Sequence, residues 1–278
     1  MKTVLMLYAR VLGQPLLLLR LGGLMMVIIV GYQAVLLLTL DSLSATNDQQ
    51  AAQEVVQQNW LRFALGVVVL VVLYIWLTTM FAVRWHRYAL LGQSNYRFLD
   101  ATFGKRGWNF VWNSFLISSL ASVVVFPFAV ALGFTIITSV AIDPTQTRQT
   151  LLILNGLMIL ASLPGLYIVG RCSLVFPAIA LGFRMRIRDS WNETRGHGLR
   201  IFLLLVAMSI PAVLGSEVTV SITPSTDLPT WLTTVVRTLI GTFFVLITTA
   251  LWASALSHAY RSLELPLHPP QPQMSGNA

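Results

Sequence analysis

The chain has 278 residues, of which 56% are hydrophobic and only 10% are charged, with a formal net charge of +8. Soluble domains carry about 25% charged residues, so this composition excludes an ordinary soluble protein. The single cysteine excludes an internal disulfide framework and a multi-cysteine metal site. The basic residues border apolar runs, which argues against nucleic acid as a partner and favours anionic lipid headgroups.

Long apolar runs recur along the chain, and a run of about 18 or more residues is typical of a membrane-spanning helix. We predict an all-α integral membrane protein with six spans, at about 16–40, 61–83, 111–140, 151–180, 199–216 and 231–258. The first span is too long and too far from the terminus to be a signal-peptide core. The spans form one transmembrane domain, residues 1–262. The Pro-rich tail, residues 263–278, is expected to be disordered.

The basic residues are distributed unequally between the two sides of these spans. Thirteen of the 18 fall on one side: Lys2, Arg10, Arg84, Arg87, Arg97, Lys105, Arg106, Arg184, Arg186, Arg188, Arg195, Arg200 and Arg261. The opposite side has only Arg62 and Arg148, and it carries acidic residues instead. Cytoplasmic loops collect Lys and Arg, so both termini are predicted to lie in the cytoplasm.

The two predicted cytoplasmic loops share one spacing. It comprises Arg97, Asp100, Arg106 and Gly107 in the first loop, and Arg186, Asp189, Arg195 and Gly196 in the second. The spacing predicts a short amphipathic helix at the membrane surface in each loop. An Arg and an Asp three residues apart can pair on one helix face, and the glycine suits the left-handed position that ends a helix.

The second of these helices also has an apolar pattern. Phe183, Ile187 and Trp191 recur every four residues, which predicts a face that enters the headgroup layer. Two interpretations of the shared spacing stay open. One is an internal parallel repeat, in which spans two and three match spans four and five. The other is a pair of unrelated basic loops.

Arginines that border the spans are the candidate lipid-headgroup contacts: Arg84, Arg87, Arg184, Arg186 and Arg188. The predicted partners are therefore membrane lipids with anionic headgroups on the cytoplasmic side. The sequence identifies no protein partner.

Arg171 lies within the fourth apolar run, where Pro164, Gly165, Gly170 and Pro177 favour a broken helix. Two interpretations are open. An intramembrane charge often marks a functional polar site. Alternatively, the span ends near this residue and the long side chain reaches the cytoplasmic headgroups.

Residue patterns of known catalytic sites do not occur. The four histidines lack metal-ligand spacing, and we find no glycine-rich phosphate loop, no G-x-S-x-G sequence and no carboxylate pair within a span. We therefore expect no catalytic residue, no metal and no cofactor.

The segments "GRCSLVFPAIALG" and "IRDSWNETRGHGLRIF" support a family resemblance over about residues 171–202. They resemble the membrane domain associated with some bacterial glycerophosphodiester phosphodiesterases and its standalone six-helix relatives. The matching positions are Arg171, Ser173, Pro177, Ala178, Ser190, Trp191, Arg195 and Gly196. The resemblance implies a bacterial inner-membrane protein of unassigned activity, because the hydrolase of such fusions is a separate soluble domain.

Three functions are compatible with these features. The first is a non-catalytic membrane protein that organises lipids or protein partners. The second is a transporter or lipid-handling protein with a polar site near Arg171. The third, a membrane enzyme, has the least support because no catalytic constellation is visible.

Overall fold

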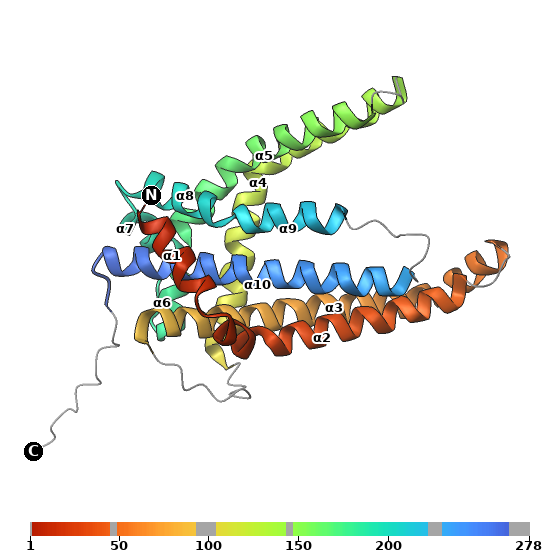
Figure 1. Ribbon diagram of the computed structural model, residues 1–278. Helices are drawn as coiled ribbons and strands as arrows, with labels where there is room; N and C mark the ends of the chain where they lie inside the picture. Colours follow the sequence, from red (N-terminus) through yellow and green to blue (C-terminus); the bar gives the residue numbers. More distant parts are fainter. Residues whose placement is uncertain (1, 45–48, 93–103, 143–146, 222–229, 267–278) are drawn as a thin grey trace, which may run out of the picture. The chain divides into compact units, whose positions relative to one another are not determined.

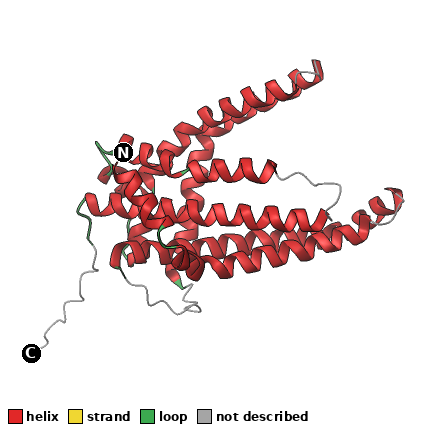
Figure 2. Ribbon diagram, in the orientation of Figure 1, coloured by secondary structure: helices red, strands yellow, loops and turns green. Residues whose placement is uncertain are grey.

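The computed structural model describes residues 2–44, 49–92, 104–142, 147–221 and 230–266, and every regular element in these residues is an α-helix (Figure 1, Figure 2). In chain order the helices are α1 Lys2–Leu12, α2 Pro15–Ser44, α3 Gln49–Leu91, α4 Lys105–Ile142, α5 Thr147–Cys172, α6 Val175–Leu181, α7 Ile187–Glu193, α8 Gly198–Met208, α9 Ile210–Ser221 and α10 Thr230–Ser262.

Six helical segments in the described residues are long and apolar enough to cross a membrane. They are Pro15–Tyr32, Ala64–Leu91, Arg106–Ala131, Leu160–Leu181, Gly198–Thr219 and Leu232–Ser262. Each overlaps one predicted span, so the prediction of an all-α protein with six spans is confirmed. The chain is an integral membrane protein. Most of the predicted disordered tail, residues 267–278, lies outside the described residues.

Some helices extend beyond the predicted spans, because the polar residues next to a span also favour helix formation. α3 begins at Gln49 rather than near residue 61, because Gln, Ala and Glu in its first turns favour a helix in water. The fourth span is interrupted: α5 continues through Pro164 and ends at Cys172, and α6 begins at Val175. The expected break in this span therefore occurs at residues 173–174, just beyond Arg171.

The chain divides into two compact units, Met1–Gly107 with Ala207–Ser254 and Trp108–Val206 with Ala255–Ala278. In the first unit α2, α3 and α10 lie side by side (Figure 1). Gly22 of α2 leaves room for Leu246 of α10, since an added Cβ would lie 2.7 Å from the Leu246 side chain. The indole N–H of Trp85 in α3 donates to the Ser254 hydroxyl of α10 at 2.8 Å. Small residues therefore allow these helices to approach closely.

The first unit also contains α1, an amphipathic helix that is too short to be a membrane span. Its buried residues, Leu7 and Val11, lie four positions apart, which is one helical turn. Tyr8 donates its hydroxyl hydrogen to the carbonyl oxygen of Ala207 at 2.7 Å. Pro211 has no N–H, so the carbonyl four residues before it, that of Ala207, lacks its usual helical donor. Partial burial raises the pKa of Tyr8, which keeps this hydroxyl protonated.

In the second unit α5 packs closely on α4, and α6 is almost completely buried. An added Cβ at Gly165 of α5 would lie 2.6 Å from the Val125 side chain of α4. Phe176 of α6 packs on Phe110 of α4, with ring centroids 4.6 Å apart. Gly182 ends α6 with a left-handed φ of 96°, and the next residues lead into α7.

Candidate functional site

The arginine segment, residues 184–200, is the most basic described part of the chain. It comprises a short non-helical stretch, α7, a turn at residues 194–197 and the start of α8. All five of its arginines are exposed: Arg184, Arg186, Arg188, Arg195 and Arg200. Two exposed acids, Asp189 and Glu193, leave the segment with an excess of positive charge. The segment can therefore attract anions.

A hydrogen bond caps the start of α7, and a left-handed glycine lies in the turn that follows it. The Asp189 carboxylate accepts a hydrogen bond from the backbone N–H of Arg186 at 3.0 Å, which caps the first turn. Gly196 has a φ of 83°, the left-handed conformation predicted from the sequence. The predicted helix in this loop is thus confirmed. Asp189 contacts Arg186 through the backbone N–H rather than through the expected pairing with its guanidinium.

Two hydroxyl groups form part of the contact between α7 and the end of α5. Ser190 and Thr194 are fully buried, at 0% exposure, whereas their neighbours in α7 are exposed or half-buried. Ser190 donates to the carbonyl oxygen of Arg171 at 2.7 Å, and the Thr194 hydroxyl lies 3.3 Å from the same oxygen. The last carbonyls of α5 have no partner within the helix, so α7 supplies one for Arg171.

The guanidinium of Arg171 completes this α5–α7 junction. It donates to the carbonyl oxygen of Trp191 and, through Nε, to the Thr194 hydroxyl at 3.2 Å. It also lies over the Trp191 ring, 3.9 Å from the centroid. A cation at the carbonyl end of α7 is favourable, because the helix dipole is negative there.

An aromatic residue, Tyr167, and a glycine, Gly198, also lie at the junction. Tyr167 meets the Trp191 ring edge-on, with centroids 6.5 Å apart. An added Cβ at Gly198 would lie 3.0 Å from both Tyr167 Oη and Arg171 Cδ. Four of the positions quoted for the family resemblance, Arg171, Ser190, Trp191 and Gly196, therefore meet here or in the adjoining turn.

The expected apolar face of the second surface helix is only partly present. Phe183 precedes α7 and does not belong to it, and the predicted face is wrong in this respect. Trp191 keeps 36% of its surface exposed, although Arg171 covers one side of its ring. Sequence periodicity did not identify the buried Ser190–Thr194 pair, although a polar i, i+4 pair on one face of a predicted surface helix could have indicated it.

Only part of the first predicted cytoplasmic loop lies in the described residues. Arg97 and Asp100 lie outside the described residues, and Arg106 is exposed. Gly107 lies in the first turn of α4, where its N–H bonds to the Gly104 carbonyl, so its expected role as a left-handed helix end is wrong. The apolar run after Gly107 favours the start of a helix there.

Two candidate headgroup contacts precede this loop. Arg84 and Arg87 are half-buried in α3, and both have partners. They are therefore less accessible to headgroups than the arginine segment.

α4 begins with an aromatic band. Trp108, Trp112 and Phe115 keep 64%, 51% and 60% of their surfaces exposed, and the last two rings stack with centroids 5.9 Å apart. Exposed tryptophans at the end of a span are typical of the membrane–water interface. This band therefore favours a headgroup-level position for the start of α4.

Among the described residues, no group of three or more His, Cys, Asp or Glu side chains could hold a metal ion. Comparisons with protein-family models, curated proteins and solved structures found no match. The family resemblance of residues 171–202 therefore stays a prediction.

Proposed function

We propose that this protein is a non-catalytic membrane protein that binds anionic lipid headgroups through the arginine segment. The five exposed arginines are the observation that carries this proposal. A guanidinium presents paired N–H donors that match the oxygens of a phosphate. Each Lys or Arg near an anionic bilayer contributes about 1 kcal/mol of binding free energy.

The α5–α7 junction supports the proposal because it presents the segment on a fixed base. Arg171, Ser190 and Thr194 hold α7 against the end of a spanning helix. Arg186 and Arg188 at the start of α7 are thereby held near the end of that span. A preorganised cluster loses less conformational freedom on binding than a disordered basic tail would.

The location that we propose is the cytoplasmic face of a bacterial inner membrane, with both termini inside. The unequal distribution of Lys and Arg along the sequence supports this orientation. The bacterial origin follows only from the resemblance of residues 171–202.

The alternative is a transporter or lipid-handling protein with a polar site at Arg171. The guanidinium already binds Trp191 and Thr194, which leaves it less able to bind a solute. We therefore favour a positioning role for Arg171 and place lipid contact in the arginine segment.

Native mass spectrometry can test the proposal with phosphatidylglycerol as the probe and phosphatidylcholine as the neutral control. In the Arg184/Arg186/Arg188→Gln variant we expect phosphatidylglycerol affinity to fall about a hundredfold, since three contributions of about 1 kcal/mol each are lost. The matched Lys variant should keep most of the affinity, because it preserves charge. Equal phosphatidylglycerol binding by wild type and Gln variant would show that these arginines serve only membrane orientation.

A further inference from the structure

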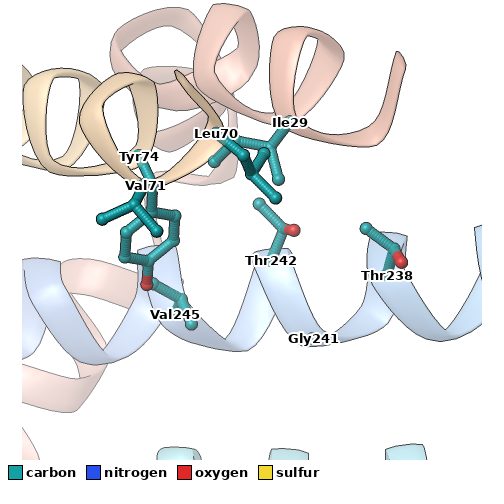
Figure 3. Close-up of a pocket in the computed structure, with 8 residues that line it drawn as sticks. All are labelled: Ile29, Leu70, Val71, Tyr74, Thr238, Gly241, Thr242 and Val245. Carbon is teal, nitrogen blue, oxygen red and sulfur yellow. The ribbon is translucent and has the colours of Figure 1, made fainter. Parts of the chain in front are cut away.

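A hollow of about 330 Å³ lies among α2, α3 and α10 in the first unit (Figure 3). The residues that line it come from all three helices: Ile29, Leu70, Val71, Tyr74, Thr238, Gly241, Thr242 and Val245. In Figure 3, Ile29, Leu70 and Thr242 point toward one another across the gap, and Tyr74 extends toward α10. Its volume is at the small end of the range typical of ligand sites, about 300–1,000 Å³.

The lining is apolar and has no formal charge. Aliphatic side chains form the α2 and α3 walls, apart from the Tyr74 ring. The α10 wall has two threonines at i and i+4, Thr238 and Thr242, with Gly241 between them. Hydroxyls of threonines in helices commonly bond to their own backbone, as Thr249 does to the Val245 carbonyl at 2.8 Å. Such a surface favours a hydrocarbon ligand over a charged solute.

The hollow lies at membrane depth. All its residues fall inside the spans Pro15–Tyr32, Ala64–Leu91 and Leu232–Ser262. Ile29 and Thr242 are buried at its base, whereas Val71 and Tyr74 keep 49% and 38% of their surfaces exposed. The side on which these two residues are exposed faces the hydrocarbon of the bilayer, which is the solvent at this depth.

We propose that this hollow, the α2–α3–α10 groove, binds one acyl chain of a bilayer lipid. An acyl chain reaches the groove sideways from the membrane and needs no hydrogen-bond partner within it. An apolar cavity of only about 150 Å³ already binds a small hydrocarbon, so this larger groove is suited to part of a lipid chain. The site does not use the arginine segment and therefore does not depend on the function proposed above.

A phosphatidylcholine with a diazirine on its acyl chain can test the groove. The protein is loaded with this lipid, transferred to detergent, washed and then irradiated, so that only retained lipid can react. Peptides containing residues 70–74 and 238–245 should carry the label. The exposed face of α4, which includes Val123 and Phe126, should lose its weakly held lipid and remain unlabelled.

Three variants distinguish lipid binding in the groove from nonspecific lipid contact with the protein surface. Thr238→Phe places an aromatic ring in the groove and should lower the label at least fivefold. Val236→Phe, on an exposed position of the same helix outside the lining, should leave the label unchanged. Thr238→Val keeps the shape and should also retain the label.

The labelled peptides of the wild type decide the question even if Thr238→Phe does not fold. Retained label on α4, or label spread over all spans, would overturn the proposal. Unchanged labelling of a folded Thr238→Phe variant would do the same. The Arg184/Arg186/Arg188→Gln variant should label as the wild type does, so failure of the groove and failure of the headgroup interface give different results.

Discussion

Arg171→Leu is expected to release α7 from the end of α5. The substitution removes the hydrogen bonds to the Trp191 carbonyl and the Thr194 hydroxyl, together with the stacking on the Trp191 ring. Hydrogen bonds that involve a charged group contribute about 1.5–3 kcal/mol each, and part of this contribution is lost at a half-exposed site. We expect the local stability of the junction to fall by about 2–4 kcal/mol.

Amide hydrogen exchange provides the measurement for Arg171. The backbone N–H groups of residues 190–201 should exchange about 30-fold faster or more in the Leu variant, whereas α10 should be unaffected. Arg171→Lys should give an intermediate result, because an ammonium keeps the charge but not the planar fork. Arg184→Gln is the matched control, since Arg184 is exposed and lies outside the junction. Unchanged exchange in the Leu variant would contradict the positioning role and favour a solute site at Arg171.

Gly215→Val is expected to disrupt the packing of α9 on α10 in the first unit. An added Cβ at Gly215 would lie 2.5 Å from both Cβ and Cγ of Phe244. These atoms are close to the α10 backbone, so the Phe244 side chain cannot avoid the clash by rotating its tip. Overpacking of this kind costs about 1–3 kcal/mol for an extra methylene, and a branched side chain should reach the upper end or exceed it.

The apparent midpoint of thermal unfolding in detergent provides the measurement for Gly215. Gly23→Val is the control, because no atom lies within 4 Å of a Cβ added at that position. Gly22→Ala should fall between them, because its nearest neighbours are the flexible methyl groups of Leu246. Equal midpoints for the Gly215 and Gly23 variants would show that α9 moves away from α10 at little cost.

The six spans could be predicted because each is a long apolar run, and hydrocarbon requires every such backbone to be helical. Small residues spaced four apart, at 161 and 165 and at 250 and 254, likewise favour close helix packing. Gly165 lies against Val125, and Ser254 accepts a hydrogen bond from Trp85. These features depend on composition and spacing along a single segment.

The candidate site was less predictable because its contacts join segments that are far apart in the sequence. Arg171 is recognisable in the sequence as an unusual charge in an apolar run. Neither interpretation of it, an intramembrane site or a headgroup contact, predicts the hydrogen bond to the Trp191 carbonyl. The α2–α3–α10 groove forms because the side chains of three spans leave space between them. The sequence of any one span therefore does not predict the groove.

The hydrogen bond between Tyr8 and Ala207 has a consequence for biosynthesis. The two residues are separated by 199 positions, and the accepting carbonyl is free because Pro211 follows it. α1 is translated before the fifth span, so this contact must wait until that span has been translated and inserted. α1 therefore stays without its partner carbonyl while the four spans between Tyr8 and Ala207 are made.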